Sequence, residues 1–244
     1  IQRGVGAAAI YAVAQSTVTV MNSRFHALQS RGAGAAAVYT SDSTVTMDRI
    51  HVTECAASNE LGVPTLSGEH SAVIVAAEQS EIAIDHAVFG ANSDDVILVD
   101  QSQAAIDHSS FINGLSGAAV VATGASTITV SNTEINSNLM AATALARAPI
   151  SLFGGSTATI ADCSFTGNVV SDGSLSEPTA GAIFATNAGT SVTVDVAAFS
   201  SNHGTALTAG AGSIYLSDAA ALTASGCTFA GNTGSSPVSA GAVL

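Results

Sequence analysis

The sequence predicts an all-β protein, a parallel β-helix of about eight rungs with three short strands in each rung. Three observations predict this fold: a repeat that runs through the whole chain of 244 residues, apolar columns that recur in phase in every copy, and insertions that fall at one corner only. Stacked rungs require such columns, because each strand pairs with the equivalent strand of the next copy. A β-sandwich also has many short strands, but the Asn-Gly hairpin signals of antiparallel pairs are scarce here.

The first strand of each copy follows a cluster of Gly and Ala, as in "GAAAIYA" and "GAIFAT". Small residues permit tight turns and close packing between layers. One larger apolar residue recurs within this strand and predicts an inward column. Its members are Ile10, Val38, Ile74, Ile97, Val120, Ile150, Ile183 and Ile214.

The middle strand alternates apolar and polar residues, which is the two-residue period of a half-buried strand. The copies are "STVTV" (16–20), "STVTM" (43–47), "SEIAI" (80–84), "SQAAI" (102–106), "STITV" (126–130), "STATI" (156–160), "TSVTV" (190–194) and "AALTA" (220–224).

The third strand carries a large apolar residue at a constant distance from the middle strand. This column is Phe25, Val52, Phe89, Phe111, Ile135, Phe165, Phe199 and Phe229. Extra residues fall only between this strand and the next copy, at 55–70, 136–149 and 169–180. Such insertions are typical of a solenoid with loops on one edge. Helical propensity over residues 139–148 predicts a short helix there.

Composition excludes several classes of partner. The chain has five Arg, no Lys and eighteen acidic residues, for a net charge of -13, which disfavours nucleic acid and anionic membrane surfaces. No apolar run approaches the roughly 20 residues of a membrane-spanning helix. Cysteine and histidine show no metal-type spacing, so neither a metal nor another cofactor is predicted.

The ends of the repeats carry a Phe-x-x-Asn motif, at 89–92, 165–168, 199–202 and 229–232, with Ile135 to Asn138 as a variant. With the Gly-Ala-Ile-like starts, this motif resembles the repeats of chlamydial polymorphic membrane proteins, in the pectin-lyase-like superfamily of right-handed parallel β-helices. The first, second and fourth copies depart from the motif, and the family's doubled Gly is mostly single here. The resemblance implies a right-handed β-helix that is exposed on a cell surface and is often adhesive.

Two Ile-Asp-His triplets become neighbours in the repeat alignment, just past the middle strands. The alignment predicts two polar columns: Asp48, Asp85 and Asp107 in one, and Arg49, His86 and His108 in the next. Carboxylates along a strand face are similar to those of polysaccharide-cleaving β-helices such as pectate lyases, so these six are the candidate catalytic residues if the chain is an enzyme. Those enzymes also need a basic residue that abstracts a proton or holds the acidic sugar, and only Arg49 lies near. The sequence therefore favours a second interpretation, in which the two triplets are one solvent-exposed turn that the repeat has duplicated.

Outward threonines on the middle strands resemble the ice-binding faces of antifreeze solenoids. The candidate binding residues are Thr17, Thr19, Thr44, Thr46, Thr127, Thr129, Thr157 and Thr159. Glu81, Ala83, Gln103 and Ala105 interrupt the array, and Thr is favoured on any solvated strand.

Other polar residues have structural interpretations. Cys163 and Cys227 share an inward column two rungs apart, about 9–10 Å, which is too far for a disulfide. Cys55 lies in the longest insertion and is predicted to be free or paired outside the chain. The Asn of the motif is expected to bond turn backbone in a stacked ladder. Asp94, Asp95 and His203 resemble polygalacturonase fragments but fall in unconnected copies.

The leading hypothesis is a single solenoid over residues 1–244 with a non-enzymatic, structural or adhesive role outside the cell or at its surface. The alternatives are a pectin-lyase-like polysaccharide-degrading enzyme and an ice-binding solenoid. First-strand motifs lie at both ends, so we expect a segment of a longer chain. The expected partners are further rungs of the same chain or neighbouring subunits, with glycans as a further candidate.

Overall fold

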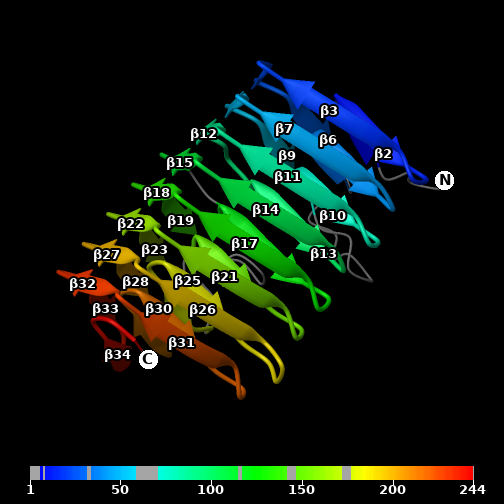
Figure 1. The fold of residues 1–244 in the computed structure, drawn as a ribbon. Helices are drawn as coiled ribbons and strands as arrows, with labels where there is room; N and C mark the ends of the chain where they lie inside the picture. The colour runs from blue at the N-terminus through cyan, green and yellow to red at the C-terminus, as the bar shows by residue number, and fades with distance from the viewer. Residues whose placement is uncertain are drawn as a thin grey trace.

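The computed structural model describes residues 6–7, 9–31, 34–58, 71–114, 117–141, 147–171 and 177–243. Strands account for the regular structure of these residues, and every strand pair is parallel. Within the described ranges no helix is long and apolar enough to cross a membrane. The rungs stack along one axis from the blue N-terminal end to the red C-terminal end (Figure 1), as a parallel β-helix does.

The first sheet gathers the small-residue strands in the order β1-β6-β10-β13-β16-β20-β25-β30, with β2 also paired to β6. The predicted apolar column is confirmed, since from Ile10 to Ile214 each member is the register partner of the next. The strands are β1 (Gly6–Ala7), β2 (Ile10–Val13), β6 (Gly34–Ser41), β10 (Ser71–Ala77), β13 (Ile97–Asp100), β16 (Val120–Thr123), β20 (Ile150–Leu152), β25 (Ile183–Ala185) and β30 (Ile214–Leu216).

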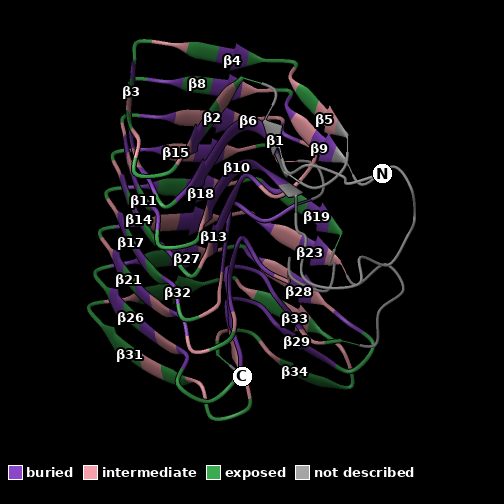
Figure 2. Ribbon diagram, turned by 90° about the vertical axis from the view of Figure 1, so that its right-hand side faces the viewer, coloured by how far each residue is buried: buried purple, intermediate pink, exposed green. Residues whose placement is uncertain are grey.

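The second sheet contains the eight middle strands in chain order and in unbroken register. Buried and outward residues alternate along them, so that Ile82 and Ile84 lie inside while Glu81 is exposed. Figure 2 shows this alternation as changes of colour along the strands. The strands are β3 (Thr17–Met21), β7 (Thr44–Asp48), β11 (Glu81–Asp85), β14 (Gln103–Asp107), β17 (Thr127–Ser131), β21 (Thr157–Ala161), β26 (Ser191–Asp195) and β31 (Ala221–Ser225).

The third sheet stacks the predicted aromatic column. Phe89 and Phe111 lie face to face with ring centroids 4.6 Å apart, and Phe165 and Phe199 with centroids 5.0 Å apart. Such offset pairs add about 0.5–1.5 kcal/mol each beyond the burial of their area. The strands are β4 (Arg24–His26), β8 (His51–Thr53), β12 (Val88–Gly90), β15 (Ser110–Ile112), β18 (Glu134–Asn136), β22 (Ser164–Thr166), β27 (Ala198–Ser200) and β32 (Thr228–Ala230).

Short further strands follow the third strand of several rungs, so three strands per rung is an underestimate. The chain stays extended beyond the third strand wherever the adjacent rung offers a parallel partner. These strands are β5 (Gln29–Arg31) with β9 (Ala56–Ser58), β19 (Leu139–Ala141) with β23 (Val169–Ser171), β28 (His203–Thr205) and β33 (Thr233–Ser235), and β24 (Thr179–Ala180) with β29 (Ala209–Ala211) and β34 (Val238–Ala240).

The prediction of a helix over residues 139–148 is wrong at its start, because Leu139–Ala141 forms strand β19, which pairs with Val169–Ser171. Parallel pairing overrides the helical propensity of these residues. Residues 142–146 lie outside the described part of the chain, as do 59–70 and 172–176 in the other two insertions.

One residue in a left-handed conformation turns the chain between the second and third strands of every rung. These corner residues are Asn22, Arg49, His86, His108, Asn132, Asp162, Val196 and Gly226, with φ between 43° and 62°. Gly, Asn, Asp and His tolerate this region better than other residues do. The corner therefore selects the residue types that occupy most of the column.

Side-chain ladders inside the corners bond one rung to the next. Before the middle strands, the backbone N–H of several serines donates to the hydroxyl of the serine one rung on, as from Ser102 to Ser126 (3.2 Å) and from Ser126 to Ser156 (3.2 Å). After the third strands, the predicted asparagine ladder is confirmed over Asn138, Asn168, Asn202 and Asn232. These ladders satisfy backbone groups that a strand register cannot reach at a corner.

The cysteines are free thiols. Cys163 and Cys227 belong to the same corner column with Ala197 in the rung between them, as predicted. Of the two alternatives predicted for Cys55, free or paired outside the chain, the structure has the first, a free thiol. Cys55 is 0% exposed, and its N–H donates to Asn92 Oδ1, so it occupies the asparagine column. Burial raises the pKa of the Cys55 thiol above its usual value.

Candidate functional site

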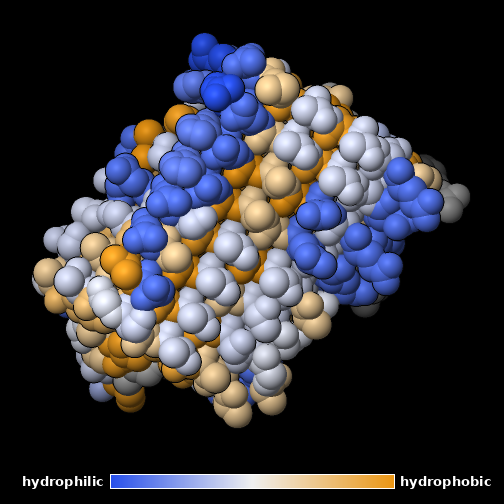
Figure 3. Space-filling model, viewed as in Figure 1, coloured by the Kyte–Doolittle hydropathy of each residue, from blue (hydrophilic) through white to orange (hydrophobic). Residues whose placement is uncertain are grey.

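The six candidate catalytic residues meet at the C-terminal ends of β7, β11 and β14. Figure 3 shows a hydrophilic band along this edge of the second sheet. Asp48, Asp85 and Asp107 are register partners in consecutive rungs, as the repeat alignment predicts. We call the set the Asp–His strip, and its members are Asp48, Arg49, Asp85, His86, Asp107 and His108.

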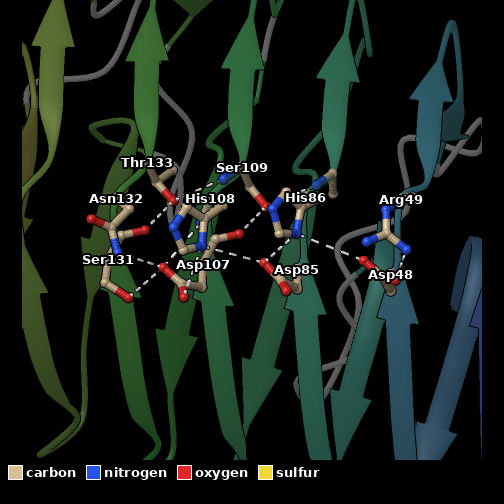
Figure 4. Close-up of polar contacts among 11 residues, drawn as sticks. Asp48, Arg49, Asp85, His86, Asp107, His108, Ser109, Ser131, Asn132 and Thr133 are labelled. Atoms are coloured by element: carbon tan, nitrogen blue, oxygen red, sulfur yellow. Dashed lines mark hydrogen bonds and ion pairs between the residues drawn. The ribbon is translucent and has the colours of Figure 1, made fainter.

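The left-handed corner explains why two histidines stand side by side. His86 and His108 occupy the corner position with φ of 52° and 43°. Below them the backbone is fixed by interior hydroxyls, since Ala87 N–H donates to Ser109 Oγ at 3.1 Å and Ser109 N–H to Thr133 Oγ1 at 3.3 Å. The strip thus rests on a rigid backbone, drawn in Figure 4.

The imidazole rings stack on each other along the strip. Their centroids are 5.0 Å apart, and the angle between the ring planes is 6°. His86 Nδ1 lies 2.9 Å from Asp85 Oδ1 and 3.7 Å from Asp48 Oδ1. His108 Nδ1 lies 3.0 Å from Asp107 Oδ2 and 3.5 Å from Asp85 Oδ1. Each ring therefore faces two carboxylates, its own and that of the preceding rung.

Arg49 closes the N-terminal end of the strip. Its Nη1 donates to Asp48 Oδ2 at 2.9 Å, while 61% of its side chain is exposed. An ion pair this exposed contributes at most about 1 kcal/mol, because water and salt screen it. Arg49 offsets part of the repulsion among the stacked carboxylates.

Asp107 is held as a carboxylate by the following rung. Asn132 Nδ2 and Ser131 Oγ each donate to Asp107 Oδ1 at 2.9 Å. The Asn132 hydrogen bond first, and then those of Ser131 and the neighbouring His108, lower the pKa of Asp107 below its usual value. Sequence reasoning missed Ser131 and Asn132, although they are the next members of the Asp107 and His108 columns.

Two carboxylate oxygens in the strip have no hydrogen bond. Asp48 Oδ1 and Asp85 Oδ1 are both shielded from solvent and lack a hydrogen-bond partner. Their nearest polar contacts are the imidazole nitrogens given above, which approach Asp85 Oδ1 at 2.9 and 3.5 Å outside hydrogen-bond geometry. An unsatisfied anionic oxygen is costly, so this point of the strip favours a positive group.

The threonine columns lie in register where the sequence predicts them. Thr17 pairs with Thr44, Thr19 with Thr46, Thr127 with Thr157 and Thr129 with Thr159. Glu81 with Gln103 and Ala83 with Ala105 fill the two rungs between these blocks. The array is therefore two separate patches, and ice binding stays a prediction.

A second polar feature is a depression of about 290 Å³ at the start of the middle strands in the first four rungs. It is open and lined by hydroxyl and amide groups together with acidic side chains. Its lining residues are Gln15, Ser16, Thr17, Asp42, Ser43, Thr44, Gln79, Ser80, Glu81 and Gln103.

The polygalacturonase-like aspartates have structural roles. Asp94 Oδ2 accepts from Ala57 N–H at 2.8 Å, and Asp95 Oδ1 accepts from Ala118 N–H at 2.8 Å. Burial raises the pKa of Asp95 to about 6, with a smaller contribution from the charge of Asp94 and against the effect of the Ala118 hydrogen bond. His203 lies elsewhere, bonded to Thr233 and Thr205.

Comparison with known families gives one match. The family model for the right handed beta helix region matches residues 2–146 and, in a second alignment, residues 65–243. The two alignments together cover nearly the whole chain. No curated protein matches the sequence.

Proposed function

The chain belongs to the right handed beta helix region family, and from that premise we propose that it is a non-enzymatic extracellular scaffold with a structural or adhesive role. One observation carries the proposal: polar side chains of several columns form hydrogen bonds to the adjacent rung. The asparagine ladder, the serine ladder and the contacts of Asp107 all serve stacking. Such a stack is rigid and presents long, regular surfaces.

The insertion edge supports the adhesive part of the proposal. The insertions at 55–70, 136–149 and 169–180 contain residues 59–70, 142–146 and 172–176, which fall in the sequence between β9 and β10, β19 and β20, and β23 and β24. Insertions in repeat proteins map to one face, which is often the binding face. Placement outside the cell rests on the resemblance of the repeats to chlamydial surface proteins.

A polysaccharide-cleaving enzyme is the second candidate, because three carboxylates in consecutive rungs line one edge. Cleavage of a glycosidic bond by hydrolysis needs a carboxylic acid whose pKa is raised so that it can protonate the leaving group. The pKa of Asp107 is shifted in the opposite direction. The family includes both enzymes and non-enzymes, so membership does not favour either function. The direction of the Asp107 pKa shift is the observation that favours a non-enzymatic role.

Co-sedimentation with insoluble glycans and with intact cells tests the adhesive role. We expect the labelled chain to be retained, and we expect replacement of residues 59–70 by a short Gly-Ser turn to reduce retention while circular dichroism shows the β-structure unchanged. Asp162→Asn, at an exposed corner between the second and third strands, is the control. A chain that stays in the supernatant with every surface would contradict adhesion.

A further inference from the structure

We propose that the Asp–His strip is a binding site for a divalent transition-metal ion, with Asp85, His86 and His108 as its protein ligands. The class of ion is one that accepts imidazole nitrogen together with carboxylate oxygen, represented by Zn²⁺ and Cu²⁺. This proposal is independent of the adhesive role, because it concerns another edge of the solenoid.

The spacing of the ligand atoms carries the proposal. Asp85 Oδ1 lies 2.9 Å from His86 Nδ1 and 3.5 Å from His108 Nδ1. In a tetrahedral zinc site with bonds of about 2.0–2.2 Å, neighbouring ligand atoms are about 3.3–3.6 Å apart. One ligand atom from each of the three residues falls within 4.8 Å of both others. Small rotations of side chains that are about half exposed would bring the three atoms to bonding distance of one ion.

The electrostatics of the strip favour a cation at this point. Asp85 Oδ1 and Asp48 Oδ1 are shielded oxygens without a hydrogen bond, and both face His86 Nδ1. A divalent ion would satisfy Asp85 Oδ1 directly and would reduce the repulsion between the two carboxylates. With the ring proton on Nε2, the lone pair of each Nδ1 is available to the ion.

The surrounding contacts orient the ligands. Asp107 Oδ1 is already bound to Asn132 and Ser131, so Asp107 acts as an anchored neighbour whose Oδ2 lies 3.0 Å from His108 Nδ1. The interior hydroxyls of Ser109 and Thr133 fix the backbone of both rungs. Three protein ligands at a half-exposed edge leave at least one coordination position for water or an external ligand.

Calcium is not expected to bind here. Ca²⁺ takes six to eight oxygen ligands, whereas two of the three ligands proposed for this site are nitrogens. The ordering of affinities should follow that of imidazole sites, with Cu²⁺ above Zn²⁺.

Isothermal titration of the whole chain with zinc chloride tests the proposal. We expect one dominant site per chain, an affinity that falls at least about tenfold in His86→Ala or His108→Ala, and no measurable binding at this site in the double variant. His203→Ala, which removes a histidine from a different sheet, should leave the affinity unchanged. Asp85→Asn should weaken binding in the same range.

A second readout separates ligation from altered folding. The Cu²⁺-loaded protein should show an electron paramagnetic resonance spectrum with two nitrogen ligands, reduced to one in each single histidine variant. Zinc binding that survives in the His86→Ala/His108→Ala variant, or that calcium displaces at equal concentration, would overturn the assignment. So would an equal loss of affinity in His203→Ala.

Discussion

Replacing Asn168 by alanine is expected to lower the free energy of unfolding by about 3–6 kcal/mol. Asn168 is 0% exposed and lies in the middle of the asparagine ladder. Its Oδ1 accepts from Asn138 N–H (3.1 Å) and Asn138 Nδ2 (2.9 Å). Its Nδ2 donates to Ile135 O (2.8 Å) and Asn202 Oδ1 (2.9 Å). Alanine leaves Asn138 N–H and Ile135 O without the Asn168 side chain, and an unsatisfied buried group costs about 1–3 kcal/mol. Asn138 Nδ2 and Asn202 Oδ1 each lose one hydrogen bond and keep another, to Phe111 O and from the backbone N–H of residue 168.

Asn136→Ala is the matched control for this prediction. Asn136 lies in the rung before, partly exposed, and its Oδ1 accepts a hydrogen bond from Thr166 N–H at 3.1 Å. Its loss should cost about 1 kcal/mol. Urea denaturation followed by circular dichroism measures both variants. Equal midpoints for Asn168→Ala and Asn136→Ala would mean that the ladder contributes no more than a surface contact.

Replacing Asp95 by asparagine is expected to stabilise the chain at neutral pH and not at pH 4. The pKa of Asp95 is raised from 3.8 to about 6 in the folded state. Between these values the folded state binds more protons than the unfolded chain, so the free energy of unfolding falls as the pH rises through this window. Above about pH 6 the full cost of the buried charge is present, roughly 1–3 kcal/mol. Asparagine removes that cost and keeps an oxygen for Ala118 N–H.

The measurement is the difference in unfolding free energy between Asp95→Asn and the unaltered chain, taken at pH 4 and pH 7.5. This difference should favour the variant by about 1–3 kcal/mol more at the higher pH. Asp162→Asn, which removes a carboxylate at an exposed corner with φ of 52°, is the control. A pH-independent difference for Asp95→Asn would show that Asp95 is not a buried charge.

The stacking of this fold can be predicted from the sequence because residues of the same type recur at the same position of each repeat. A parallel solenoid places equivalent residues one above another, so the recurrence of Phe at the third strand fixes the register directly. The same logic places Asp85 beside Asp107 and His86 beside His108, and the structure confirms both neighbours. Burial of the alternate residues follows from the two-residue period.

The sequence does not predict the details that depend on the corners. Recognition of the left-handed position would have paired Asn132 with His108 and shown Asp107 to be bonded by the next rung. The extra strands depend on a partner in the adjacent rung, which local propensity does not encode. Cys55 replaces the Asn of its column, so the sequence does not show that its backbone N–H donates to Asn92 Oδ1 in the ladder.

We propose that the solenoid works by binding and that the carboxylates along its edge have no catalytic role. The most direct measurement is the release of reducing ends and unsaturated products from polygalacturonate and other acidic glycans, with and without calcium, by the unaltered chain and by the Asp85→Ala/Asp107→Ala variant. The account predicts no release above background from either protein. Turnover by the unaltered chain that the double variant abolishes would contradict it.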